Sequence, residues 1–192
     1  MDKKWEDEIT YEANLGIILK KKIRISPAGI EWEGQLWTLD SITRIGFCIF
    51  SHSVNYIPVG TNYTVSFGTR SKRLSIDLRK KNIYLNFVEC LWKAVGVRIL
   101  NEYLDGLRNR QQYEFSSVIV RHDGIYFKKK LSEDIILLWH ELVIQNESGG
   151  FSIWEKSQIN TWGFKTHEEF SYIQDNVPVL EALFRTFGVE YV

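Results

Sequence analysis

The sequence has little of what metal binding, disulfide formation or membrane insertion requires. Its two cysteines, Cys48 and Cys90, lie far apart and outside any CxxC or metal-ligand spacing. We therefore expect both to pack as buried apolar side chains, with neither a zinc site nor a disulfide. No stretch approaches the roughly 20 apolar residues of a membrane helix, and the first residues lack the apolar segment of a signal peptide. The expected location is the cytoplasm.

Catalytic signatures are also missing. The sequence has no nucleophile elbow, P-loop, HExxH or GxGxxG motif, and its four histidines stand apart from one another.

The formal net charge is zero, which argues against nucleic acid as a partner. The charge is unevenly spread, because residues 1–110 have 17 basic and 12 acidic residues (+5) and residues 111–192 have 7 and 12 (−5). Together with the strand edges that open meanders expose, this asymmetry predicts self-association into a homodimer or a short chain of molecules.

What the sequence does contain is a repeat. Residues 90–100, CLWKAVGVRIL, and residues 182–192, ALFRTFGVEYV, share a small residue, a leucine, an aromatic residue and a basic residue, with Gly-Val two residues later. The pattern predicts two amphipathic helices that end at Gly96 and Gly188, because glycine favours the left-handed conformation found just past many helix ends.

A second landmark lies upstream in each copy. The pairs Gly29-Ile30 and Gly124-Ile125 each separate two predicted strands. From the first glycine to the helix end there are 67 residues in one copy and 64 in the other, counted from Gly29 to Gly96 and from Gly124 to Gly188. The copies therefore keep register, and the chain is predicted to be a duplicated module.

A chain of 192 residues with two such copies is predicted to form two small domains, each with its own core. We expect an N-terminal arm at 1–12 and a first module at 13–96. A helical connector follows at 97–110, with its helix at 97–107, and the second module occupies 111–192.

Short strands precede the helix in each copy. In the first copy, strands are predicted at 15–26, 30–33, 36–39, 45–50, 63–67 and 73–78. A helix capped by Asn82 follows. In the second copy, strands are predicted at 113–121, 124–128, 135–138, 142–145, 151–154 and 159–164. The second helix is expected from about 176 to 187, with Pro178 in its first turn.

Two meanders of short antiparallel strands, each closed by one amphipathic helix, resemble the pleckstrin-homology-like (PH-like) superfold, including its bacterial and GRAM-type members. The residues behind the resemblance are Gly29-Ile30, Gly124-Ile125, the steps LDSI at 39–42 and WHEL at 139–142, and the helices with Trp92 and Phe184. The predicted fold class is α+β, with two tandem PH-like modules, each a strand meander or partly open barrel closed by a C-terminal helix. The resemblance implies a binding or scaffolding module for phosphoinositides, peptides or partner domains.

Candidate ligand-binding residues are basic or lie in 51–62, a stretch without periodicity that is predicted to be a long loop in the first copy alone. Anionic lipid requires several cations on one surface, whereas the alternative explanation is solvated strand ends that protect against aggregation. His52 and Asn55 place a titratable ring and an amide in the loop. The candidate residues are Lys20, Lys21, Lys22, His52, Asn55, Arg70, Lys72 and Arg73.

These features predict a non-catalytic protein that binds or scaffolds an unidentified protein partner, without a cofactor or a metal. The alternative is a peripheral membrane protein that contacts anionic lipid or phosphoinositide through its basic clusters. A third hypothesis is an enzyme that works in the loop at 51–62. Fold analogy alone does not choose among them.

Overall fold

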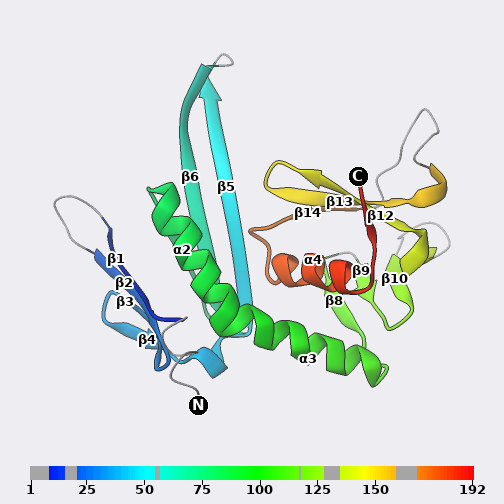
Figure 1. Ribbon diagram of the computed structural model, residues 1–192, viewed down its shortest axis with the longest axis horizontal. Helices are drawn as coiled ribbons and strands as arrows, with labels where there is room; N and C mark the ends of the chain where they lie inside the picture. Colours follow the sequence, from blue (N-terminus) through cyan, green and yellow to red (C-terminus); the bar gives the residue numbers. More distant parts are fainter. Residues whose placement is uncertain (1–8, 16–20, 55–56, 117, 128–134, 159–167) are drawn as a thin grey trace. The chain divides into compact units, whose positions relative to one another are not determined.

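The computed structural model describes residues 9–15, 21–54, 57–116, 118–127, 135–158 and 168–192. It has four sheets and one long helix, and the chain divides into two compact units, unit 1 (Met1–Ile99) and unit 2 (Leu100–Val192) (Figure 1). The described strands form no closed barrel. The predicted α+β class is confirmed. No helix in the described part of the chain is long and apolar enough to cross a membrane.

Unit 1 contains two antiparallel sheets and a helix. Its first sheet is a meander of β1 (Tyr11–Leu15), β2 (Lys21–Ser26), β3 (Gly29–Trp32) and β4 (Gln35–Trp37). A 3-10 turn, η1 (Leu39–Ser41), leads to the second sheet. That sheet consists of β5 (Arg44–Val54), β6 (Ile57–Gly68) and β7 (Arg73–Leu78). The helix α2 (Lys81–Leu91) follows.

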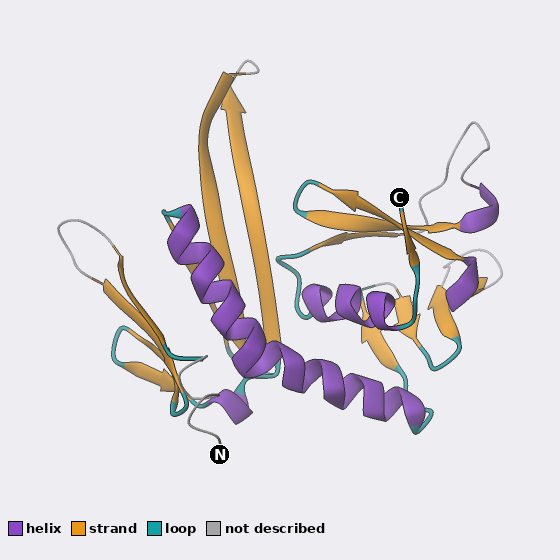
Figure 2. Ribbon diagram, viewed as in Figure 1, coloured by secondary structure: helices purple, strands orange, loops and turns teal. Residues whose placement is uncertain are grey.

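Unit 2 repeats this order of elements. Its first sheet is a meander of β8 (Tyr113–Phe115), β9 (Val118–Val120), β10 (Gly124–Phe127) and β11 (Ile135–Leu138). A 3-10 turn, η3 (Trp139–Glu141), leads to the second sheet. That sheet contains β12 (Leu142–Glu147), β13 (Gly150–Glu155) and β14 (Glu168–Ser171), with η4 (Lys156–Gln158) after β13. The helix α4 (Val177–Thr186) follows, and β15 (Glu190–Tyr191) then pairs parallel to β12 (Figure 2).

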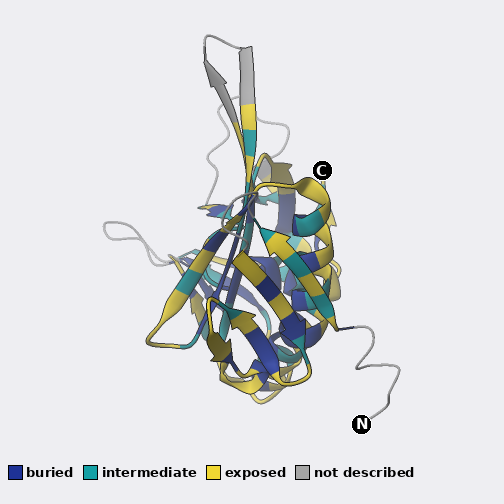
Figure 3. Ribbon diagram, turned by 90° about the vertical axis from the view of Figure 1, so that its left-hand side faces the viewer, coloured by how far each residue is buried: buried dark blue, intermediate teal, exposed yellow. Residues whose placement is uncertain are grey.

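Alternating burial along the strands builds the core of unit 1. On β2, Ile23 and Ile25 are fully buried while the residues between and before them are exposed. Figure 3 shows strands banded in buried and exposed colours. Helix α2 covers β6, where the Phe67 and Phe87 ring centroids lie 6.5 Å apart. Trp37 adds an edge-to-face contact with Phe67 at 5.8 Å. Full burial of one such side chain contributes about 1.5–3 kcal/mol.

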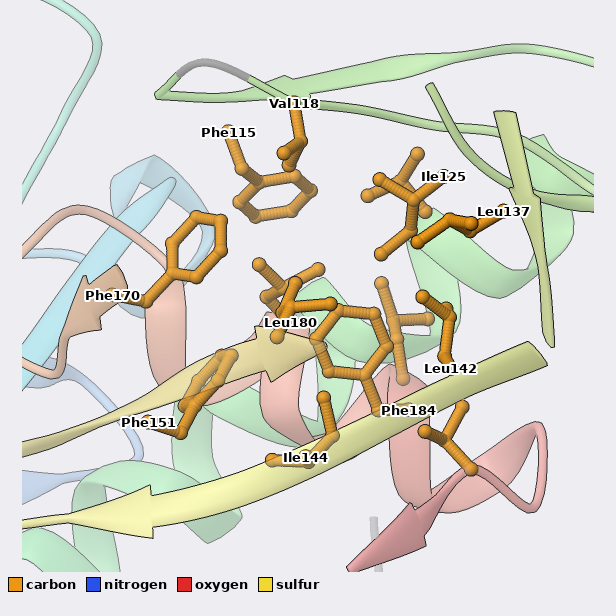
Figure 4. Close-up of a cluster of buried hydrophobic side chains, with 14 of the residues drawn as sticks. Phe115, Val118, Ile125, Leu137, Leu142, Ile144, Phe151, Phe170, Leu180 and Phe184 are labelled. Atoms are coloured by element: carbon orange, nitrogen blue, oxygen red, sulfur yellow. The ribbon is translucent and has the colours of Figure 1, made fainter. Parts of the chain in front are cut away.

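The core of unit 2 is built around the apolar face of α4 (Figure 4). Phe184 is fully buried, and its ring meets the Phe151 ring edge to face at 5.8 Å. Phe151 in turn stacks on Phe170 of β14 at 5.2 Å. Because Phe151 and Phe184 come from β13 and α4, these contacts hold the helix against the second sheet.

The first shared glycine has one physical role in both units. A Cβ on Gly29 would lie 2.3 Å from the Trp37 carbonyl oxygen, and a Cβ on Gly124 would lie 2.1 Å from the Leu137 carbonyl oxygen. No real side chain fits at such distances. Glycine is therefore required because β4 and β11 pass directly beside the start of β3 and β10, respectively.

The second shared glycine, Gly96 in unit 1 and Gly188 in unit 2, has a different role in each unit. Gly188 ends α4 as predicted, with φ at +70°. The Val189 N–H donates to the Phe184 carbonyl (3.0 Å) and the Gly188 N–H to the Arg185 carbonyl (3.2 Å), which is the Schellman pattern. The prediction that Gly96 ends a helix is wrong. Gly96 lies in a π-helical segment, η2 (Trp92–Gly96), and α3 (Val97–Arg108) continues from it.

Packing explains why glycine occurs at position 96. The φ of Gly96 is not positive, and a Cβ there would lie 2.4 Å from Cε3 of Trp92. Glycine therefore makes room for the indole ring of the preceding turn. The chain stays helical because residues 97–108 present a good amphipathic pattern. The two units divide between Ile99 and Leu100, within α3, which lies where the sequence predicts the connector helix.

Other local predictions had mixed outcomes. Asn82 lies inside α2, whose N-cap is Lys80. Pro178 is in the first turn of α4, as predicted. The strand predicted at 113–121 is two antiparallel strands, β8 and β9, and the chain reverses after Phe115 at Ser116, whose φ is +53°. The strand predicted at 159–164 lies outside the described residues.

The predicted loop at 51–62 is mostly strand. Residues 51–54 continue β5 and residues 57–62 begin β6, so this stretch forms the end of one long hairpin. The stretch lacks the usual alternation because β7 stops at Leu78, opposite Tyr63, and a two-stranded ribbon beyond that point does not have to bury one face. Figure 1 shows the hairpin running past the end of α2.

Candidate binding surfaces

The structure does not test the hypothesis of an enzyme that works at 51–62. His52 is on β5, opposite Gly60 across the ladder, and Asn55 lies outside the described residues. His122 faces Asp123 at 3.7 Å, and both side chains are nearly half exposed. No group of three or more metal-ligating side chains occurs among the described residues.

Neither Cys48 nor Cys90, both of which the structure describes, forms a disulfide. Cys48 is buried, as expected, whereas Cys90 is only half buried. Burial raises the pKa of the Cys90 thiol, and the neighbouring charge of Glu89 raises it further. This thiol is protonated at neutral pH, and it therefore lacks the thiolate form that a nucleophile or a metal ligand requires.

The basic candidates are distributed over β2 and the β6–β7 turn of unit 1, and Lys20 lies outside the described residues. Lys21 forms an ion pair with Glu33, and Lys22 pairs with Glu12 at 2.8 Å. Both ammonium groups are thus matched by carboxylates on neighbouring strands. Exposed pairs of this kind contribute about 0–1 kcal/mol to stability.

The basic candidates at the β6–β7 turn, Arg70, Lys72 and Arg73, also take part in contacts. The Lys72 ammonium donates to Gln35 Oε1 (2.9 Å) and lies 4.9 Å from the centroid of the Trp37 ring. Arg73 donates to the Ser66 hydroxyl (2.9 Å), and the backbone carbonyl of Arg70 accepts from Arg44 (2.9 Å). The Lys72 and Arg73 side chains are therefore engaged within unit 1, whereas Arg70 takes part through its backbone carbonyl.

The structure brings two of the basic candidates to one place. Lys21 and Lys72 both reach the β3–β4 turn, where Glu33 and Gln35 accept from them. The Glu33 carboxylate pairs with Lys21 and lies two residues along the chain from Gln35, which accepts from Lys72. Its negative charge opposes an anionic ligand at this turn.

A shallow cavity of about 320 Å³ occurs in unit 2. It is lined by Glu114, Phe115, Ser116, Gln174, Asp175 and Val177. None of the predicted binding residues takes part. The lining contains two carboxylates and a hydroxyl group, but no histidine, cysteine or lysine.

The first sheets of the two units differ on the faces that point away from their cores. In unit 1, strand pairing aligns an outer row of Glu12, Arg24, Glu31 and Leu36. In unit 2, strand pairing aligns an outer row of Glu114, Ile119, Tyr126 and Ile136. Successive side chains of a strand point to opposite faces of the sheet. Each row therefore lies on the face away from the core, and its neighbours along each strand face the core. Two charged residues of the first row, Arg24 and Glu31, therefore correspond to Ile119 and Tyr126 in the second row.

The apolar character of unit 2 extends to the edge of its sheet. Strand β11 is an outer strand, and its sequence, Ile-Ile-Leu-Leu, has no polar residue. Ile136 is 50% exposed and Leu138 37% exposed, on the same face. The backbone N–H of Leu138 is held by the Glu141 carboxylate at 2.9 Å, which fixes the end of the strand. The outer row of unit 2 and Leu138 together form an apolar outer face, in which Ile136 and Leu138 are exposed and Ile119 is buried.

Sequence analysis missed this face. The sequence IILL at 135–138 predicts a strand but not the strand's position at an edge, because an apolar run without alternation is equally typical of a buried strand. One signal was available in the sequence. The strands of the first copy have alternating charges, as in KKIRIS at 21–26, whereas those of the second copy are mostly uncharged, as in EFSSVIV at 114–120 and IYF at 125–127.

No family model matches this chain, and no curated protein or solved structure matches it either. Its function is therefore inferred from the surfaces of the molecule.

Proposed function

We propose that the protein is a non-catalytic binding protein of the cytoplasm, built from two tandem PH-like modules, and that it acts through protein–protein interaction. The order of elements supports the modules, since each unit has seven described strands in two sheets followed by a helix, and unit 2 then adds β15 to its second sheet. The PH-like resemblance rests on the same succession of strand meander and closing helix.

The observation that carries the proposal is the apolar outer face of unit 2. In unit 1 the equivalents of Ile119 and Tyr126 are the charged residues Arg24 and Glu31, so the architecture itself does not require apolar residues there, whereas the equivalent of Ile136 is also apolar, Leu36. Ile136 and Leu138 are large, exposed and adjacent to a sheet edge. Exposed apolar clusters of this kind mark surfaces that bind other proteins. The partner would present an extended, uncharged, apolar segment that lies along β11.

Site-specific photocrosslinking tests this proposal. A photoreactive phenylalanine at position 136 should crosslink to a second, different protein in an extract of the source cells. The matched control is the same residue at position 36, since Leu36 occupies the corresponding place in the outer row of unit 1 and is 58% exposed. Ile136→Lys should reduce capture of the partner roughly tenfold or more, as for a residue at the centre of an interface. Equal crosslinking at both positions would contradict the proposal.

Vesicle flotation distinguishes the alternative, a peripheral membrane protein. If the protein floats with vesicles containing phosphatidylserine or phosphoinositide, and Lys72→Glu abolishes flotation, lipid binding replaces the proposal. The pairing of Lys21 and Lys22 with carboxylates favours the opposite result. We expect no flotation above that with neutral vesicles.

A further inference from the structure

The β5–β6 hairpin of unit 1 contains no charged residue over most of its length. Residues 45–69 are 25 consecutive positions without Lys, Arg, Asp or Glu, in a chain of which 25% is charged. At that average, about six charges would be expected. The hairpin is also the longest in the described part of the chain, since β5 has 11 residues and β6 has 12.

Strand β5 is an outer strand of its sheet. Ile49 is 38% exposed and Phe50 46% exposed, and Ser51 beside them is also exposed. Among the described residues, these three form ladder pairs with β6 alone. An outer strand with exposed apolar side chains and no charge is a template for pairing with another strand.

Every other outer strand in the described part of the chain is either short or charged. The short ones, β4, β8, β11 and β15, have four residues or fewer. The charged ones, β1, β7 and the four-residue β14, each include at least one carboxylate, at Glu12, Asp77, Glu168 or Glu169. Of these described outer strands, only β5 is both long and free of charge after its first residue, Arg44.

Unit 2 shows how the corresponding edge is covered there. Strand β12 has the place in unit 2 that β5 has in unit 1, and β15 pairs with it, with Val143 opposite Glu190 and Ile144 opposite Tyr191. The equivalent segment of unit 1 follows Gly96 and is part of helix α3. It therefore supplies no such strand to β5.

We propose that the β5 edge of unit 1 pairs antiparallel with the β5 edge of a second copy of this chain. A second copy offers a strand of equal length that is equally free of charge, so no charged group loses its hydration in the contact. Antiparallel pairing of a strand with itself is closed by a two-fold axis. Because the other outer strands are short or charged, assembly stops at a dimer. This inference does not depend on the proposed function, which concerns unit 2.

Analytical ultracentrifugation of the full chain over a concentration series tests the dimer. Wild-type protein should form a dimer whose dissociation constant changes little between low and high salt, because the contact is uncharged. Phe50→Lys should raise that constant roughly tenfold or more, since it places like charges in the paired edge. Leu36→Lys, an equally drastic change at a more exposed residue of another outer strand, should leave it unchanged.

Disulfide trapping gives a second, independent measurement. Ser51→Cys should yield a disulfide-linked dimer on mild oxidation, and Ser75→Cys, at an exposed site on β7 in the same sheet, should not. A monomer at all concentrations overturns the proposal, as does a dimer that survives Phe50→Lys. A dimer that dissociates at high salt overturns it too, and would indicate head-to-tail contact between the basic and acidic halves of the chain.

Discussion

Replacing Gly188 with alanine should destabilise unit 2 by about 1 kcal/mol. At φ +70° an L-amino acid is in the left-handed region, which costs roughly 1–2 kcal/mol. Alanine also has less conformational freedom than glycine in the unfolded chain, which offsets about 0.4–1 kcal/mol of that cost. No heavy atom lies within 4 Å of the added Cβ, so there is no steric contribution.

Thermal unfolding measures this change. For a domain of 60–100 residues, 1 kcal/mol corresponds to a shift of about 4–8 °C in Tm. Tryptophan fluorescence reports on the region directly, because the Trp139 ring stacks on the Phe187 ring at 4.4 Å, next to Gly188. Gly188→Asn is the control, since asparagine tolerates the left-handed region and should cost less than alanine. If alanine and asparagine cost the same, or alanine costs nothing, the reasoning from backbone conformation is refuted.

Two further predictions concern the cores of the units. Phe184→Ala and Phe87→Ala should each lower the free energy of unfolding by about 3–5 kcal/mol in urea titrations, because both rings are fully buried; a loss under 1 kcal/mol would contradict their central position. Burial raises the pKa of Tyr84 to about 12, above its ordinary value of 10.0. The neutral ring therefore stabilises the fold fully below pH 10, and this contribution is lost as the pH rises from 10 to about 12. In urea midpoints measured across that range, Tyr84→Phe should show a smaller alkaline decrease than wild type.

The sequence predicted the α+β class and the positions of most strands, because alternation and turn residues are local signals. It also predicted the end of α4 at Gly188. It did not predict the outcome at Gly96, although the two glycines occur in the same pattern. The difference lies in the residues after each glycine, since residues 97–108 continue as an amphipathic helix whereas residues 190–191 pair with β12. Only the three-dimensional setting distinguishes these outcomes.

The candidate surfaces were harder to predict than the fold. Sequence analysis selected Lys21 and Lys72 as cations but could not show that Glu33 and Gln35 accept from them, because the latter contact spans 37 residues. It interpreted 51–62 as a loop because a projecting ribbon lacks the alternation that marks a half-buried strand. The absence of charge over 45–69 was visible in the sequence, and it becomes informative only once β5 is known to be an outer strand.

The two units together provide an internal comparison that a single domain would not. Both place a four-stranded meander, a turn, three strands and a helix in the same order, so both impose the same packing requirements on equivalent positions. The glycines at 29 and 124 fulfil one such requirement and are the same in both. The outer rows face away from the core and meet no such requirement, and at two of their positions the residues differ in polarity: Arg24 and Glu31 in unit 1 correspond to Ile119 and Tyr126 in unit 2. Exposed apolar residues reduce solubility and contribute nothing to the packing that both units share. Their presence at Ile136 and Leu138, and in the uncharged hairpin of unit 1, therefore points to contacts outside the unit itself.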